Sequence, residues 1–173
     1  MIFTGFKRKS NQIFLRKRGA QLLERPSKNE AGTIKKVFVI LDEGSKKSFL
    51  TKEIVKTLNI TEKDVVSVVF QQKIDKENVD EDIVSPKDFG WYGNIKSEHL
   101  KSILTNKYDL LINYSKVDNL YSNLLILQCK SLFNVGFEHL DNRFYDLMID
   151  CKSDDFKSFN SELIKYLKIL KKI

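Results

Sequence analysis

Two runs of β-branched and aromatic residues, Val37-Phe38-Val39-Ile40-Leu41 and Val65-Val66-Ser67-Val68-Val69-Phe70, decide the fold class. Apolar runs of this length are typical of strands that are buried on both faces of a parallel sheet. Residues 45–58, which lie between the two runs, have the apolar spacing of an amphipathic helix. A strand, a crossover helix and a second strand are the repeating unit of an α/β fold.

The same alternation resumes near the middle of the chain. We expect helices at 97–105, 119–130 and 155–170, and strands at 109–114, 133–137 and 146–149. The intervening segment 71–96 is polar and contains six acidic residues, and we expect it to be a loop or excursion with some local structure. The sequence therefore predicts a Rossmann-like three-layer α/β sandwich of about five mainly parallel strands with helices on both faces.

Positive charge is concentrated at the N-terminus. The chain has 173 residues and a formal net charge of +7, and residues 1–36 contain ten Lys or Arg residues but only Glu24 and Glu30 as acids. The remaining residues carry 20 basic and 21 acidic side chains, so they contribute nothing to the positive charge. An asymmetry of this kind indicates a polyanionic partner.

A basic helix is expected to carry most of this charge. Apolar residues recur at helical spacing over residues 6–24, Pro26 ends the pattern, and 27–33 is a polar linker. We therefore divide the chain into a basic N-terminal arm and linker, residues 1–34, and an α/β domain, residues 35–173. The candidate RNA-binding residues are Lys7, Arg8, Lys9, Arg16, Lys17, Arg18, Arg25, Lys28, Lys35 and Lys36. Two basic triplets, starting at Lys7 and Arg16, lie about 13 Å apart along a helix and reach different phosphates.

Two other interpretations of the arm stay open. A basic amphipathic helix can lie on an anionic membrane, here with Ile2, Phe3, Phe6, Ile13 and Phe14 inserted. The arm can also pack on its own domain. RNA is favoured over both alternatives, and we do not expect a membrane partner.

The ends of the expected strands offer no recognisable catalytic or cofactor site. Asp42-Glu43-Gly44-Ser45 follows the first strand, where a dinucleotide site requires several glycines, and two carboxylates repel phosphate. His99 and His139 lack partners at metal-ligand spacing. His139, Asp141 and Arg143 suggest a salt-bridged turn more than an acid–base group. We expect no catalytic residue, no metal, no cofactor, no small-molecule substrate and no enzymatic activity.

The charge order at the N-terminus and the two cysteines indicate where the protein is located. The charge order at the N-terminus is the reverse of a secretory signal, and Cys129 and Cys151 have no disulfide-scaffold spacing, so we expect a cytoplasmic protein.

The aromatic segment Phe89-Gly90-Trp91-Tyr92 has two interpretations. If it is exposed, it stacks on bases or a sugar; if it is buried, Trp91 closes one end of the core. Burial of Trp91 is favoured.

Several short motifs resemble a family of small uncharacterised α/β proteins from Bacteroidota, over most of the chain. They are Ser85-Pro86-Lys87-Asp88-Phe89-Gly90-Trp91, Leu111-Ile112-Asn113-Tyr114, Asp118-Asn119-Leu120-Tyr121, Val135-Gly136-Phe137 and Tyr166-Leu167-Lys168-Ile169-Leu170. The resemblance implies a lineage-specific protein of the large ribosomal subunit. It brings no catalytic residues with it.

A fainter similarity is to the N-terminal, acceptor-side half of heptosyltransferase-like glycosyltransferases. It rests on Tyr108-Asp109-Leu110-Leu111-Ile112-Asn113 and on Val135-Gly136-Phe137. Those enzymes bind their nucleotide-sugar with a second Rossmann-like domain, for which this sequence has no room. The similarity implies common ancestry at most.

The sequence thus suggests a ribosome-associated, rRNA-binding structural protein that is anchored through its basic arm. Its expected partners are rRNA and neighbouring ribosomal proteins. The alternatives are a degenerate, single-domain relative of a glycosyltransferase that binds a ligand or protein, and a peripheral membrane protein.

Overall fold

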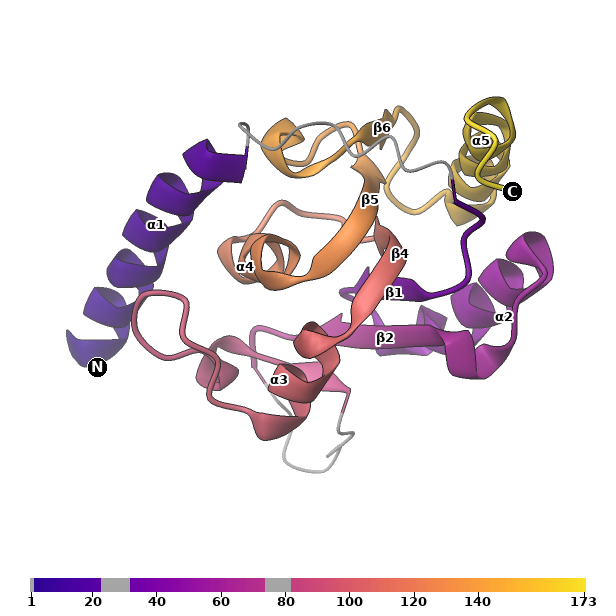
Figure 1. The fold of residues 1–173 in the computed structure, drawn as a ribbon. Coiled ribbons are helices and arrows are strands. Elements are labelled where there is room, and N and C mark those ends of the chain that lie inside the picture. The colour runs from indigo at the N-terminus through magenta and orange to yellow at the C-terminus, as the bar shows by residue number, and fades with distance from the viewer. Residues whose placement is uncertain (1, 23–31, 74–81) are drawn as a thin grey trace.

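A six-stranded, fully parallel sheet forms the centre of the molecule (Figure 1). The computed structural model describes residues 2–22, 32–73 and 82–173. The strand order is β3-β2-β1-β4-β5-β6. The strands are β1 (Val37–Leu41), β2 (Val65–Phe70), β3 (Ile83–Val84), β4 (Lys107–Asn113), β5 (Lys130–Phe137) and β6 (Leu147–Ile149). The predicted α/β class and Rossmann-like arrangement are confirmed.

The sheet has one strand more than the sequence predicted. Strand β3 lies inside the segment 71–96, which was expected to be a loop, and pairs Ile83 with Val69 and Val84 with Phe70. Two residues are too few to produce a recognisable strand pattern in the sequence. Strand β5 also begins earlier than expected, at Lys130, because its first residues pair with Lys107 and Tyr108 of β4.

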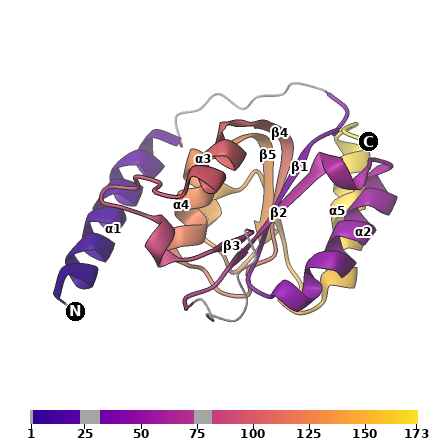
Figure 2. The same ribbon diagram turned by 90° about the horizontal axis from the view of Figure 1, so that it is seen from below.

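Helices cover both faces of the sheet (Figure 2). They are α1 (Ile2–Leu22), α2 (Lys47–Leu58), α3 (Glu98–Thr105), α4 (Leu120–Gln128) and α5 (Phe156–Ile169). Helices α2 and α5 lie on one face and α3 and α4 on the other. Alternate residues of β1 point to the two faces: Phe38 and Ile40 pack toward α3 and α4, and Val37, Val39 and Leu41 toward α2 and α5.

Helix α4 is buried on every side. All residues from Tyr121 to Leu127 are buried, including the polar Ser122 and Asn123. A helix without an exposed face needs a cover on the side away from the sheet. Helix α1 supplies this cover, so the body has a fourth layer in the order α2/α5, sheet, α3/α4 and α1 (Figures 1 and 2).

The direction of winding reverses between β1 and β4. Strands β2 and β3 lie on one side of β1, and β4, β5 and β6 on the other. In open α/β sheets the crevice at the carboxyl ends of the two strands at such a reversal is the usual ligand site. The loops that follow β1 and β4 are therefore the first place to look for a functional site.

Candidate nucleic-acid interface

The crevice between β1 and β4 is bridged by side chains of its own loops. The backbone N–H of Lys116 donates to Asp42 Oδ2 at 2.6 Å, and Lys116 Nζ donates to Glu43 Oε1 at 2.5 Å. The side chain of Tyr114 lies on the face of the sheet that α2 and α5 cover, and its hydroxyl donates to Asn160 Oδ1 of α5 at 2.5 Å. Lys116 after β4 thus joins the two carboxylates that follow β1, whereas the buried Ser115 Oγ beside it has no hydrogen-bond partner among the described residues.

Helix α1 is fastened to the body by a buried asparagine. Asn11 is fully buried, its Nδ2 donates to the Gly90 carbonyl at 3.1 Å, and its Oδ1 accepts from the Gly93 N–H at 2.7 Å. The backbone N–H of Tyr92 donates to Ser10 Oγ at 3.3 Å. These bonds attach the loop 89–95 to one side of α1 (Figure 1). The loop follows a short 3-10 turn, Pro86–Asp88, and lies between β3 and α3 in the chain.

Apolar contacts complete the attachment. Leu15 is buried against α4, and the ring of Phe14 packs over Gly93 so closely that a Cβ there would lie 2.5 Å from Cε1. Gln128, at the end of α4, donates from Nε2 to the Gly93 carbonyl at 3.0 Å. Helix α1 is therefore part of the packed body. The division of the chain at residue 34 stays a prediction, but the arm is not detached from the domain.

Lys7 points toward the body, although it was a candidate for RNA contact. Its Nζ donates to the Pro86 carbonyl at 3.0 Å and to the Phe89 carbonyl at 2.9 Å. Burial is the main cause of a lowered pKa for Lys7; Lys96 lowers it further, whereas Asp88 raises it. An ammonium with these partners anchors α1, and we assign Lys7 that structural role.

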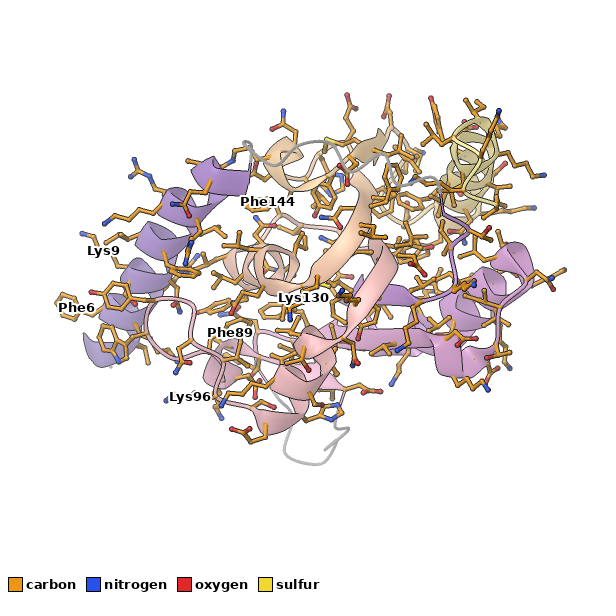
Figure 3. All side chains as sticks on the ribbon, viewed as in Figure 1. Phe6, Lys9, Phe89, Lys96, Lys130 and Phe144 are labelled. Atoms are coloured by element: carbon orange, nitrogen blue, oxygen red, sulfur yellow. The ribbon has the colours of Figure 1, made fainter. Side chains whose placement is uncertain are left out.

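The other cations of α1 are exposed to solvent. Arg8, Lys9, Arg16, Lys17 and Arg18 are all exposed. Figure 3 shows Lys9 directed away from the sheet, whereas Phe89 and Phe144 lie on the inner side of the helix. The structure thus leaves five of the ten predicted residues exposed on α1, and we call these five the outward cations.

The remaining predicted cations do not join this group. Lys35 and Lys36 are exposed and precede β1 at the amino edge of the sheet, where their backbone N–H groups both donate to Asp109 Oδ2 at 2.8 Å. Arg25 and Lys28 lie outside the described residues.

A cleft of about 520 Å³ lies between α1 and the carboxyl edge of the sheet, and three of the outward cations line it. Helix α1 forms one wall, and the loops after β2, β4 and β5 form the other. The lining residues include Arg8, Lys9, Gln12 and Arg16 from α1, and Gln72, Asp118, Asn119, Asn123 and Asp141 from the body. The cleft therefore has a cationic wall and a partly anionic wall.

Hydrogen bonds within the body fix the anionic wall. Asp118 Oδ1 accepts from Asn123 Nδ2 at 3.0 Å and from the Asp141 N–H at 3.2 Å. The side chain of Asp141 accepts at Oδ1 from Arg143 Nε at 2.8 Å, and the hydrogen bonding by the Arg143 side chain is the main reason why the pKa of Asp141 is lowered. Asn123 Oδ1 is buried and has no hydrogen-bond partner among the described residues. The N-terminus of α4 is capped by Asn119, whose side chain accepts from the backbone of Tyr121 and Ser122.

The aromatic segment is divided between core and surface. Phe89 is fully buried, with its ring centroid 5.1 Å from that of Tyr121, whereas Trp91 is 47% and Tyr92 62% exposed. The expected burial of Trp91 is therefore wrong. Phe89 occupies the core position, and the bonds from Asn11 hold the following residues at the surface.

The histidines take part in local contacts. His99 Nε2 lies 3.5 Å from Asp82 Oδ1, and the ring of His139 stacks on that of Phe137 with centroids 5.5 Å apart. Arg143 pairs with Asp141 in a turn, as the sequence suggested. Within the described part of the chain, no three His, Cys, Asp or Glu side chains come together as possible metal ligands. No described helix is long and apolar enough to cross a membrane.

The comparisons with known proteins identify the family. A family model described as "Family of unknown function (DUF6913)" matches residues 7–170. The chain belongs to the DUF6913 family. No curated protein and no solved structure matches it.

The extent of the DUF6913 match agrees with the packing of α1. The matched region begins at Lys7, so it includes the residues of α1 that dock on the loop 89–95 as well as the sheet. The family unit is therefore the helix together with the body.

Sequence reasoning missed the residues that fasten α1. A signal was present: Asn11 lies four residues before Leu15, in the row of α1 that faces the body, where helical spacing favours an apolar residue. A polar residue in an apolar row indicates a buried hydrogen-bond partner. The sequence does not reveal that this partner is a loop some 80 residues away, since no local pattern relates the two segments.

Proposed function

We propose that this protein binds RNA through the exposed cations of α1. The observation that carries the proposal is that α1 is fixed to the body by Asn11, while five of its cations, Arg8, Lys9, Arg16, Lys17 and Arg18, stay exposed. Cations that are held on a packed helix lose less conformational entropy on binding than cations on a free arm. Arg side chains add bidentate contacts to phosphate oxygens.

The spacing of the cations suits a phosphate backbone. The two groups, Arg8 with Lys9 and Arg16 to Arg18, are separated by about 12 Å along the helix. This separation exceeds the Debye length of about 8 Å at physiological salt, so each group attracts its own phosphates. Residues 37–173 are nearly neutral overall, with 20 basic and 21 acidic side chains.

The packing of α1 argues against the membrane alternative. A helix that lies in a membrane interface needs a free apolar face. Phe14 and Leu15 pack on the body instead, so they are not free to insert. Phe6 and Ile13 are exposed, and the side chains of Ile2 and Phe3 lie outside the described part of the structure.

The ribosome is the RNA particle that we propose as the partner. The support is the resemblance to a family associated with the large subunit, together with the hydrogen bonds of Lys116 to Asp42 and Glu43, which occupy both carboxylates at the strand reversal. In this proposal rRNA binds α1, neighbouring ribosomal proteins contact the body, and the protein has no small-molecule substrate.

A ligand-binding module is the second candidate function, and the cleft favours it. Its volume of about 520 Å³ suits a small ligand, and the unpartnered Asn123 Oδ1 can accept a hydrogen bond. A thermal-shift screen with nucleotides and sugars tests this candidate. A ligand present at 100 times its dissociation constant stabilises the protein by about 2.7 kcal/mol.

The affinity of the purified protein for rRNA fragments tests the main proposal. We compare the wild type with a variant in which Arg8, Lys9, Arg16, Lys17 and Arg18 are replaced by Ala. The matched control removes the same charge from α2 and α5, by replacing the exposed Lys52, Lys56, Lys157, Lys165 and Lys168 with Ala.

We expect the α1 variant to lose affinity on the order of a hundredfold at moderate salt. Its slope of log affinity against log salt should become shallower by about 3.5 to 4.5. The control variant should bind nearly as well as the wild type. Equal losses in the two variants would mean that net charge, and not α1, governs binding.

A further inference from the structure

Three large aromatic or apolar side chains are exposed around one end of α1. Phe6 is 59%, Trp91 47% and Tyr92 62% exposed. Phe6 lies one helical turn before Ser10, and Ser10 Oγ accepts from the Tyr92 N–H at 3.3 Å, so the three residues belong to one region of the surface. Figure 3 shows Phe6 on the outer side of α1, opposite to the buried Phe89.

The loop that carries Trp91 and Tyr92 is held rigidly. The Asn94 N–H donates to the Trp91 carbonyl at 3.1 Å, the Gly90 N–H donates to the Asn94 carbonyl at 2.6 Å, and Phe89 and Ile95 pair as an antiparallel bridge. The buried Asn11 holds both ends of the resulting turn. The two aromatic side chains are thus displayed on a closed turn that is anchored to α1.

The backbone of Tyr92 is strained. Its φ is +51°, in the left-handed region that a bulky aromatic residue rarely adopts. Strain of this kind persists only where the surrounding bonds impose it, and it occurs frequently at ligand-binding sites. Here it keeps a tyrosine ring in solvent beside a basic helix.

We propose that Phe6, Trp91 and Tyr92 form an aromatic platform on which unpaired bases of RNA stack. This inference rests on the proposed function and adds a ligand class to it, namely single-stranded or looped RNA. Phosphates of the same strand bind the outward cations of α1, while its bases lie on the platform. Aromatic side chains next to a basic surface are the usual device for binding unpaired nucleotides.

Charge favours RNA as the occupant of the platform. Lys9 and Lys17 are exposed on α1; by helical geometry Lys17 continues the row of Phe6, Ser10 and Ile13, and Lys9 lies beside it. An apolar protein partner would have to bury these ammonium groups, which is costly, whereas a polyanion neutralises them.

Trp91 provides a direct probe because it is the only tryptophan in the chain. We titrate the full-length protein with single-stranded oligoadenylate and with an RNA duplex that has the same number of phosphates. A base that stacks on Trp91 should quench its fluorescence. We expect strong quenching by the single strand and little by the duplex.

Variants separate stacking from charge. Trp91→Ala and Tyr92→Ala should each weaken binding of oligoadenylate about tenfold, which is about 1.4 kcal/mol, and leave binding of heparin unchanged. Trp91→Phe should retain most of the affinity. The control Phe49→Ala removes an aromatic side chain of similar exposure, 53%, from α2 and should have no effect.

The outcomes distinguish this inference from the proposed function. If oligoadenylate binds but neither quenches Trp91 nor responds to the Ala variants, the platform is refuted and RNA binding by α1 stands. If no RNA binds at all, the proposed function fails first. If vesicles of phosphatidylserine and phosphatidylcholine shift the Trp91 emission to the blue and RNA leaves it unchanged, the occupant is a membrane and the inference is wrong.

Discussion

Asn11 lies in the row of α1 that faces the body, surrounded by residues that pack in the core. Its side-chain amide meets one backbone carbonyl and one backbone N–H of the loop 89–95, so neither of these buried groups is left without a partner. Buried backbone groups that lose their partner destabilise a protein more than an average hydrogen bond stabilises it. The position of α1 therefore depends strongly on this one residue.

Replacing Asn11 with Ala should lower the free energy of unfolding by about 2–4 kcal/mol, because two buried backbone groups lose their partner. Urea denaturation measures the change. The neighbouring Gln12→Ala, at an exposed position, should change the free energy by less than about 0.5 kcal/mol. A similar small effect for both variants would show that Asn11 does not hold the loop.

The backbone conformation and the close packing at position 93 require a glycine. Its φ is +76°, and a Cβ would lie 2.5 Å from Cε1 of Phe14. Gly93→Ala should destabilise the protein by about 2–4 kcal/mol through backbone strain and the clash together.

Gly5 provides the opposite case for the same measurement. It lies in α1, and a Cβ at this position would meet no described atom within 4 Å apart from the local helix backbone, so Gly5→Ala should stabilise the protein by about 0.5–1 kcal/mol. If Gly93→Ala were also neutral or stabilising in thermal or urea denaturation, the close contact between Phe14 and the loop would be wrong.

At the scale of elements, the strands could be predicted from the sequence and the attachment of α1 could not. Strands β1 and β2 are continuous β-branched runs, which local sequence alone identifies. Strand β3 exists because two residues pair with β2, and such a short strand depends on its neighbour. Helix α1 was recognised as a helix, but its docking depends on contacts with α4 and with a distant loop, which no periodicity reveals.

Helix α4 did contain a hint of its cover. The stretch from Leu124 to Leu127 is apolar without interruption, so it cannot leave one face in water at low cost. In the structure, Leu15 of α1 is part of the same apolar cluster as α4. The candidate site was only half predictable for the same reason: the cations were visible in the sequence, but which of them face outward depends on this packing.

Introducing a carboxylate between the two helices tests the docking of α1. Leu15→Asp should lower the free energy of unfolding by about 3 kcal/mol or more, because it places a carboxylate in a buried apolar cluster. It should also increase the binding of a hydrophobic dye as α4 becomes exposed.

The matched variant is Ile13→Asp, whose side chain is 41% exposed on the outer side of α1. Its effect on the free energy of unfolding should be within about 0.5 kcal/mol, and its dye binding should equal that of the wild type. Equal dye binding by the two Asp variants would mean that α1 does not cover α4.

At the scale of the whole molecule, stability should depend on pH in the alkaline range. Burial raises the pKa of the Cys129 thiol and of the Tyr108 hydroxyl to about 12 in each case. Burial also raises the pKa values of Tyr114 and Tyr145. In the unfolded chain these groups lose their protons near pH 9 to 10, whereas in the folded protein they keep them.

The unfolded state therefore binds fewer protons above about pH 9, and the free energy of unfolding should fall as the pH rises from there toward 12. Each group contributes up to about 1.4 kcal/mol per pH unit in this window. Lys7 has a lowered pKa and acts in the opposite direction, but it is one group against four.

Urea denaturation between pH 8 and 10.5 measures this decline, and Tyr108→Phe should make it less steep by removing one titrating group. A free energy of unfolding that stays constant or rises over this interval would contradict the burial of these side chains.

The central claim is that the outward cations of α1 bind the protein to ribosomal RNA. Removing residues 1–35 would also uncover α4, so the charge variant of α1 is the more direct test. Sedimentation of native lysates through sucrose gradients at low and high salt, with detection of the full-length protein, is the decisive measurement.

We expect the wild type and the α2/α5 charge control to migrate with the large ribosomal subunit at low salt and to be released at high salt. The variant that lacks the five α1 cations should stay at the top of the gradient while remaining folded. Wild-type protein that stays at the top at low salt, or an α1 variant that still migrates with the ribosome, would contradict the account.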